Sequence, residues 1–397
     1  MKQFRTLDDL PADVGGNVAL VRVDFNVPMA NGQVSDDTRL RAAIPTVKEL
    51  QAKNAAVVLL AHFGRPKGKV VPEMSLRPIV APLSTLLGTE VKFCDDLDQP
   101  HLTTENLEPG EVLLLENLRF KAGEEANDPK FVDVLAQCGD IWVNDAFSAA
   151  HRAHASTEGL GHKLPAYAGR TMQAELDALD KALGKPAKPV IAIVGGAKVS
   201  TKIDLLENLV TKVDALVIGG GMANTFLHAQ GVQIGKSLAE KDLAATALRI
   251  MDKAEASNCA IILPVDATVS YHFAANSPSF AYGLDAIPPD SMILDVGPQS
   301  TARIHSAIDD AATLVWNGPV GAFELAPFDR GTMVAAKHAA ERTKAKKLIS
   351  VAGGGDTVAA LNQAGVASDF TYVSTAGGAF LEWMEGKPLP GVEVLKA

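Results

Sequence analysis

The feature that most constrains the fold is a pattern that occurs four times in the second half of the chain. In each copy a short apolar run leads into two or three glycines, and a stretch with helical spacing follows; the clusters begin at Gly195, Gly219, Gly353 and Gly377. Strand, glycine turn and helix form the repeating unit of a doubly wound parallel sheet. The pattern also predicts several helix N-termini at one edge of that sheet, where phosphate groups bind well.

The first half shows the same alternation without glycine clusters. Apolar runs at 18–23, 55–61, 112–115 and 141–143 are separated by segments with helical spacing, such as 38–53 and 77–87. Strands that are apolar throughout are typical of a parallel sheet covered by helices on both faces. A chain of 397 residues is long enough for two or three such domains.

An amphipathic helix followed by a proline-rich segment marks the expected domain boundary. One stripe of this helix is formed by Met172, Leu176, Leu179 and Leu183, and prolines follow at 186 and 189. The predicted fold class is therefore α/β, with two doubly wound parallel-sheet (Rossmann-like) domains joined by a hinge helix. The expected parts are a first domain over 1–172 with the tail 383–397 packing back on it, an interdomain helix and linker over 173–188, and a second domain over 189–382.

Charge is unevenly distributed along the chain. The formal net charge is −10, yet nine of the thirteen arginines lie within residues 1–170. Because guanidinium groups match phosphate and carboxylate geometry, this bias favours a pocket for a small anion. The alternative is that these arginines pair with surface carboxylates. The acidic balance argues against a general nucleic-acid or membrane-surface partner.

Other features narrow the class of protein. The N-terminus lacks the pattern of a signal peptide, the apolar runs are too short to span a bilayer, and the three cysteines lack the spacing of a zinc site or a disulfide framework. We therefore expect a cytoplasmic protein with reduced thiols. P-loop, dinucleotide-binding and protein-kinase motifs are absent. The serine-hydrolase motif is absent as well, so covalent catalysis is not indicated.

Polar side chains follow the predicted strands of the first half. Arg22, Asp24 and Asn26 alternate along one run, and a period of two places them on one face. Polar residues also follow the other three runs. His62 and Arg65 come after 55–61, Arg119 after 112–115, and Arg152 after 141–143. Because ligands of α/β sheets bind at the carboxyl ends of strands, these residues predict a binding site, although each alone is compatible with a structural ion pair.

The glycine turns of the second half carry three further candidates. Lys198 and Lys202 are four residues apart, which predicts one face at the start of a helix, where the dipole disfavours cations unless an anion is bound. A solvated helix start is the alternative. Asp356 follows Gly355 and is compatible with an N-cap, with a ligand for Mg²⁺ on nucleotide phosphates, or with both.

In combination these segments resemble the signatures of the phosphoglycerate kinase family. The resemblance runs in order over residues 18–380 and has the length of the bacterial type. It is carried by Val18 to Pro28, His62-Phe-Gly-Arg65-Pro, Glu116-Asn-Leu-Arg119-Phe, Asn144-Asp-Ala-Phe, Ala150-His-Arg152-Ala-His, Gly195-Gly-Ala-Lys198-Val-Ser-Thr-Lys202, Gly219-Gly-Gly-Met-Ala-Asn-Thr-Phe, Trp316-Asn317-Gly-Pro-Val-Gly-Ala-Phe-Glu324 and Gly353-Gly-Gly-Asp356-Thr357.

The resemblance implies reversible phosphoryl transfer from 1,3-bisphosphoglycerate to ADP, giving 3-phosphoglycerate and ATP, with Mg²⁺ accompanying the nucleotide. Phosphoglycerate would bind the first domain and nucleotide the second, and the domains would close about a hinge in a monomer. The attacking oxygen is already ionised at neutral pH, so no general base is needed. Rival classes are a two-lobed, non-catalytic binder of an anionic metabolite and a nicotinamide dehydrogenase, whose fingerprint is missing.

The resemblance also assigns residues. Arg39 and Lys198 would be catalytic and flank the moving phosphoryl group from opposite domains, and Asp356 would hold the magnesium–nucleotide. Substrate binding would fall to Arg22, Asp24, Phe25, Asn26, Arg39, His62, Phe63, Gly64, Arg65, Arg119 and Arg152. Nucleotide binding would fall to Lys198, Lys202, Gly219, Gly220, Gly221, Gly297, Asn317, Glu324, Gly353, Gly354, Gly355, Asp356 and Thr357.

Two positions depart from the family pattern. Ala376 stands where the family usually has glycine, and it adds a methyl group near a turn that would face phosphate. Ala61 stands where serine is frequent. We expect both substitutions to be tolerated.

Overall fold

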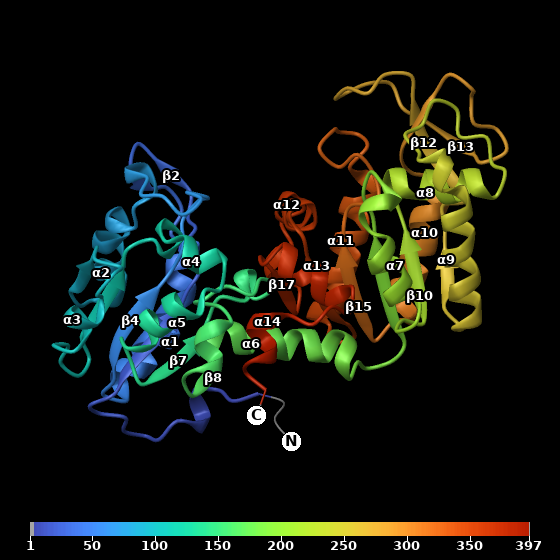
Figure 1. Ribbon diagram of the computed structural model, residues 1–397. Coiled ribbons are helices and arrows are strands. Elements are labelled where there is room, and N and C mark those ends of the chain that lie inside the picture. The colour runs from blue at the N-terminus through green and yellow to red at the C-terminus, as the bar shows by residue number, and fades with distance from the viewer. Residues whose placement is uncertain (1–3, 397) are drawn as a thin grey trace. The chain divides into compact units, whose positions relative to one another are not determined.

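The computed structural model describes residues 4–396, and the chain forms two compact units (Figure 1). The first consists of Met1–Leu176 with Pro388–Ala397, and the second of Asp177–Lys387. The division falls inside helix α6 (Arg170–Leu179), four residues after the expected limit at 172. Residues 383–387 also belong to the second unit, because Met384 is fully buried there and Lys387 pairs with Asp204.

The first unit is built on a six-stranded sheet with the order β5-β6-β4-β1-β7-β8, in which every strand pair is parallel. The strands β4 and β6 are buried along their whole length, which explains their unbroken apolar sequence. The strands are β1 (Val18–Arg22), β4 (Ala56–Leu60), β5 (Val91–Cys94), β6 (Val112–Leu115), β7 (Ile141–Asn144) and β8 (Ala166–Ala168).

Helices cover this sheet and bury their apolar stripes against it. In α1 the buried residues include Leu40, Val47 and Leu50, which lie on one helical face and join the core of the unit. Asp128 caps α5 by accepting a hydrogen bond from the Lys130 N–H. The helices are α1 (Thr38–Ala52), α2 (Val80–Leu87), α3 (His101–Thr104), α4 (Ala122–Glu125), α5 (Pro129–Ala136) and α14 (Pro390–Glu393), and a small hairpin joins β2 (Met29–Ala30) to β3 (Gln33–Val34).

The second unit has a parallel sheet with the order β11-β10-β9-β15-β16-β17. Counted along this sheet the order is 3-2-1-4-5-6, the dinucleotide-fold order, and it reverses between β9 and β15. The strands are β9 (Val190–Val194), β10 (Ala215–Ile218), β11 (Ala260–Ile262), β15 (Thr313–Asn317), β16 (Ile349–Gly353) and β17 (Tyr372–Ser374). The prediction of an α/β fold with two parallel sheets is confirmed.

The helices of the second unit pack on both faces of its sheet. Four buried alanines of α11, at 335, 336, 339 and 340, let that helix approach the core closely. A π-helical turn, Asp180–Gly184, follows α6. The helices are α7 (Ile203–Leu209), α8 (Gly220–Ala229), α9 (Ala244–Ala256), α10 (Pro298–Asp310), α11 (Arg330–Lys344), α12 (Gly355–Gln363) and α13 (Gly378–Met384).

The sequence patterns did not predict a third sheet that interrupts the strand–helix alternation of the second unit. It is antiparallel, with the order β13-β12-β14, and β14 packs against α8. The strands are β12 (Asp266–Ser270), β13 (Phe280–Gly283) and β14 (Met292–Val296), and Figure 1 shows β12 and β13 beside α8. Among the described residues no helix is long and apolar enough to cross a membrane.

Candidate active site

A basic cluster lies at the carboxyl ends of four neighbouring strands of the first sheet. Arg22 ends β1, His62 follows β4, Arg119 follows β6, and Arg152 follows β7. The strands β6, β4, β1 and β7 are consecutive in the sheet, so their carboxyl ends lie side by side. The topology therefore brings together the four polar segments that are far apart in sequence.

Arg22 is the buried centre of this cluster. Its side chain has no exposed surface, and each guanidinium nitrogen donates a hydrogen bond. Nε donates to Ser156 Oγ at 2.8 Å, Nη1 to the Val23 carbonyl at 2.5 Å, and Nη2 to His62 Nδ1 at 2.8 Å. Because the side chain is buried and each of its three nitrogens is engaged inside the protein, Arg22 is placed to support the site from within.

The cluster carries more positive than negative charge, although carboxylates lie near Arg22, Arg39 and Arg119. Burial, together with the charges of Arg22 and Arg119, lowers the pKa of His62 well below its ordinary value. Burial and the same arginines lower the pKa of His154 to about 4. Two imidazoles that stay neutral next to several arginines indicate a site that favours an anion. His154 is a member that the predicted set missed, although it lies in the quoted segment 150–154.

Arg39, on the first turn of α1, reaches the loop after β1. Its Nη1 donates to Asp24 Oδ1 at 3.1 Å and to the Asn26 carbonyl at 2.8 Å, and the side chain stays 37% exposed. The strand β1 ends at Arg22, but the alternation predicted for this segment continues beyond it. Val23, Phe25 and Val27 join the core that also holds Val21, whereas Asp24 and Asn26 are less buried. Arg39 lies against the loop that carries Asp24 and Asn26.

The remaining residues of this set differ in what they offer. Phe25 is fully buried in the hydrophobic core, so a ligand could meet only its backbone, and Phe63 packs against the same core. Gly64 has a left-handed φ of 60°; its N–H donates to Asn26 Oδ1, and its carbonyl accepts from Arg119 Nη1. Arg65 and Arg152 have exposed side chains, and Arg152 Nε is hydrogen-bonded to His151 Nε2 at 3.2 Å.

Lys202 lies at the reversal point of the second sheet. Its ammonium donates to the Gly195 carbonyl at 2.7 Å, after β9, and to Asn317 Oδ1 at 2.6 Å, at the end of β15. A third bond, of 3.1 Å, goes to the Asn317 carbonyl. Burial lowers the pKa of Lys202 to about 8, and Asp356 partly opposes this effect.

The spacing predicted that Lys198 and Lys202 lie on one face of a helix. The structure shows that they do not. A 3-10 turn, Val199–Thr201, separates them, and α7 begins only at Ile203. Lys198 has extended backbone and an exposed side chain, whereas the side chain of Lys202 turns back toward the strand ends. The difference arises because the segment after Gly196 forms a loop before the helix starts.

Most glycines of the strand–helix turns are required by backbone packing. A Cβ at Gly195 would lie 1.8 Å from the Pro319 carbonyl oxygen, and one at Gly219 would lie 2.6 Å from Val320. Gly220 and Gly221 likewise approach the backbone of residues 196 and 197, and Gly353 approaches the ring of Phe380. Gly355, at the start of α12, is different: a Cβ there would meet nothing within 4 Å.

Asp356 does not cap α12. The helix begins at Gly355 with Gly354, at a φ of 97°, as its N-cap, and Asp356 is the second helical residue with an exposed side chain. Thr357 is buried and accepts a hydrogen bond from the Gly318 N–H at 2.7 Å, while Asn317 Nδ2 donates to the Gly353 carbonyl. Asn317 and Thr357 thus fix the loops, and Asp356 remains available for a ligand.

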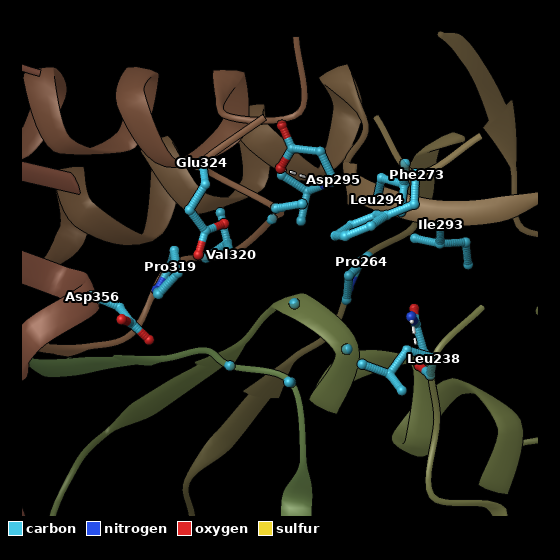
Figure 2. Close-up of a pocket in the computed structure, with 18 residues that line it drawn as sticks. Leu238, Pro264, Phe273, Ile293, Leu294, Asp295, Pro319, Val320, Glu324 and Asp356 are labelled. Carbon is cyan, nitrogen blue, oxygen red and sulfur yellow. Dashed lines mark hydrogen bonds between the residues drawn. The ribbon is translucent and has the colours of Figure 1, made fainter. Parts of the chain in front are cut away.

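A pocket of about 260 Å³ opens between these loops and the antiparallel sheet. Figure 2 shows apolar side chains, including Phe273 and Ile293, at one end and the carboxylate of Asp356 at the other. Glu324 lies along the wall between them. The full lining is Gly196, Ala197, Gly220, Gly221, Asn224, Leu238, Pro264, Phe273, Ile293, Leu294, Asp295, Val296, Pro319, Val320, Gly321, Ala322, Glu324 and Asp356.

The pocket shows what sequence patterns missed. Leu238, Phe273 and Leu294 line its apolar end, but they belong to a loop and to the antiparallel sheet, which no motif marked. Gly297, which was predicted, does not line it; a Cβ there would instead collide with the Asp266 carboxylate at 2.3 Å. Its neighbours Asp295 and Val296 line the pocket instead. Burial raises the pKa of Asp295 to about 7.

Fold and site together define a class of protein: a two-unit α/β protein with an anion-attracting cluster on one parallel sheet and an elongated pocket at the reversal point of the other. Comparison with known proteins identifies the family. The family model described as phosphoglycerate kinase matches residues 7–387, and the chain belongs to the phosphoglycerate kinase family.

Curated relatives cover the whole chain. The chain is 76% identical over 396 residues to "Phosphoglycerate kinase" of Bradyrhizobium diazoefficiens, with 99% of each chain covered. It is 74% identical to the protein of that name from Rhodopseudomonas palustris, covering all of this chain and 99% of the relative. Among solved structures, phosphoglycerate kinase from Coxiella burnetii is similar at 41% identity and a TM-score of 0.93, with 99% and 98% covered.

Proposed function

We propose that this phosphoglycerate kinase family enzyme binds phosphoglycerate on the basic cluster and nucleotide in the pocket of the second unit. The reaction is the reversible transfer of a phosphoryl group between 1,3-bisphosphoglycerate and ADP. One observation carries the proposal: the basic cluster and the elongated pocket each lie at the carboxyl ends of a doubly wound sheet, where such folds bind ligands.

The pocket suits a nucleotide from one end to the other. The apolar end with Phe273 and Ile293 offers a surface on which a purine base can pack. Glu324 supplies carboxylate oxygens that can accept hydrogen bonds from ribose hydroxyls. Asp356 and the backbone at Gly196 then lie at the end that the phosphates would occupy, next to Gly355, whose missing side chain leaves room for them.

The donor set fits Mg²⁺ that arrives on nucleotide phosphates. Among residues 4–396 no group of three or more His, Cys, Asp and Glu side chains could hold a metal ion. Asp356 provides one exposed carboxylate in the pocket, and Mg²⁺ is commonly bound by one or two carboxylates together with substrate phosphates. The ion would neutralise phosphate charge, and Asp356 would hold and orient the complex.

The chemistry requires alignment and charge neutralisation, and the chain supplies both. Because the attacking oxygen is already ionised, no proton has to be removed, and in-line transfer depends on cationic groups around the moving phosphoryl group. Arg39 and Lys198 supply them from different units, which requires the units to close. The proposal places the enzyme in the cytoplasm as a monomer.

The test measures ATP consumption by the purified protein with 3-phosphoglycerate and Mg²⁺, while the acyl phosphate is removed by coupling. Turnover should require all three components, and Lys198→Ala should lower kcat by roughly a hundredfold or more. Lys212→Ala, which removes an exposed lysine of the same unit, is the matched control and should retain activity. Binding of both ligands without turnover would instead support a non-catalytic binding protein.

A further inference from the structure

A buried chain of hydrogen bonds in the first unit ends at His62. It starts at Glu124, which is fully buried in α4, and continues through Ser156 and Arg22. Ser156 Oγ donates to Glu124 Oε1 at 2.5 Å, and the Ser156 N–H donates to Glu124 Oε2 at 3.1 Å. The same Ser156 oxygen accepts the bond from Arg22 Nε, so one hydroxyl joins the carboxylate to the guanidinium.

The chain determines which nitrogen of His62 carries a proton. The guanidinium of Arg22 can only donate, so His62 Nδ1, 2.8 Å from Arg22 Nη2, must accept. A neutral imidazole that accepts on Nδ1 carries its hydrogen on Nε2. Within residues 4–396 the hydrogen bond of the His62 ring is made at Nδ1, which leaves the Nε2–H to donate to a ligand.

Resting on the proposed function, we propose that Glu124 and Ser156 are positioning residues for phosphoglycerate binding. Through Arg22 they hold His62 as a neutral Nε2–H donor toward the anionic substrate. His62 then recognises the substrate by a directed hydrogen bond, while the net charge comes from the arginines.

The surroundings of His62 keep it in this state. Protonating Nδ1 would point an N–H at the N–H of Arg22, and the groups that face the ring are mainly cationic. Burial acts first, then Arg22, Arg119, His154 and Arg39, and all of them lower the pKa of His62. Glu124 is the counter-charge that attracts Arg22, although burial raises its own pKa.

The direct test uses the wild-type protein without substrate. Nitrogen-15 NMR of the histidine rings distinguishes the two neutral tautomers and the imidazolium. Between pH 6 and 8 His62 should be neutral with its hydrogen on Nε2. An Nδ1–H tautomer, or a protonated ring at pH 6.5, would overturn the proposal. This result does not depend on turnover, so it separates the inference from failure of the proposed function.

Two variants test the role of the chain in binding. Ser156→Ala should raise KM for 3-phosphoglycerate by about threefold to tenfold, the value of one buried hydrogen bond, with kcat and KM for ATP within twofold. Glu124→Gln should act in the same direction and more strongly. In both, the His62 ring signals should show a mixture of tautomers. Ser84→Ala removes a hydroxyl of the same unit that bonds the Val80 carbonyl and the Val91 N–H, and it should change none of these values.

A variant that fails to fold would be recognised by its melting curve, and the tautomer of the wild-type protein would still decide the question. If both variants fold, and KM for 3-phosphoglycerate and the His62 signals remain those of wild type, the positioning role of Glu124 and Ser156 is refuted. Loss of kcat with equal changes in both KM values would also contradict it, because that result indicates general damage.

Discussion

At the scale of single residues, the site depends on groups whose polar atoms are already engaged inside the protein. Lys202 is the clearest case, because all three of its hydrogen bonds go to protein oxygens at the ends of β9 and β15. To bind a phosphate it must exchange one of them. Because its pKa is about 8, its charge changes near physiological pH, and its electrostatic attraction for a polyphosphate changes with it.

We predict that ADP binding weakens as the pH rises through 8. Phosphates favour the protonated lysine, so binding is coupled to proton uptake above the pKa of the free protein, and Kd should rise by up to about tenfold per pH unit there. Lys202→Arg, which stays charged, should remove this dependence even if it binds more weakly. Titration calorimetry from pH 7 to 9 makes the measurement; equal pH profiles in both proteins would contradict the role.

Gly355 provides a second prediction at this scale. Alanine fits there without collision and suits the first turn of a helix, so Gly355→Ala should leave the melting temperature unchanged or slightly raised. If a phosphate approaches the backbone at this point, the added methyl group should still weaken ADP binding by roughly tenfold, as one lost hydrogen bond would. Gly195→Ala should instead unfold or rearrange the turn. An unchanged ADP affinity in a folded Gly355→Ala protein would exclude close approach.

At the scale of elements, the start of α6 is held by Asp145. The carboxylate follows β7 and accepts from the N–H groups of Thr171 at 2.8 Å and Met172 at 3.1 Å, while Gly169 leaves room for it. This contact ties the first turn of α6 to the end of a central strand. The Asp145 carboxylate is strongly desolvated, because it is buried, and this burial raises its pKa to about 7.

Removing this cap should destabilise the first unit. Asp145→Ala should lower the free energy of unfolding by about 1–2 kcal/mol, the usual value of an N-cap. Asp145→Asn keeps an acceptor oxygen and should lose less. Urea unfolding followed by circular dichroism compares the two. If the alanine variant is as stable as wild type, the contact does not stabilise the helix.

At the scale of the whole molecule, the proposed mechanism requires the two units to close when both substrates are bound. We expect the hinge in residues 171–189 and the 380s, where the chain passes between the units twice. Small-angle scattering should show a smaller radius of gyration with 3-phosphoglycerate and nucleotide together than with either alone. Unchanged scattering would contradict closure, whereas the tautomer of His62 should be the same in both states.

The departure at Ala376 can be judged at the same scale. Its backbone is not in the left-handed region, which the next residue, Gly377, occupies at a φ of 50°. Alanine therefore adopts the required conformation at position 376, and its side chain is buried. That Ala376 leaves catalysis intact stays a prediction.

Much of the fold could be predicted, because burial of apolar side chains determines both the local sequence patterns and the packing of the elements. Apolar runs that are buried on both faces must be strands of a covered sheet, and glycine turns mark where they lead into helices. The antiparallel sheet of β12 to β14 was missed because its short strands lack both signals. For the same reason Phe273 and Leu294 were absent from the predicted pocket.

The sequence by itself determined the α/β class, the strands that carry polar residues at their ends, and the family, since these depend on local periodicity and on motifs. Only the tertiary structure decided which groups meet. Arg22 and Ser156 are 134 residues apart, and Lys202 and Asn317 are 115 apart. The order of strands in each sheet brings these groups together, and burial then determines their protonation. No local pattern encodes either effect, because both depend on what the rest of the chain places around a side chain.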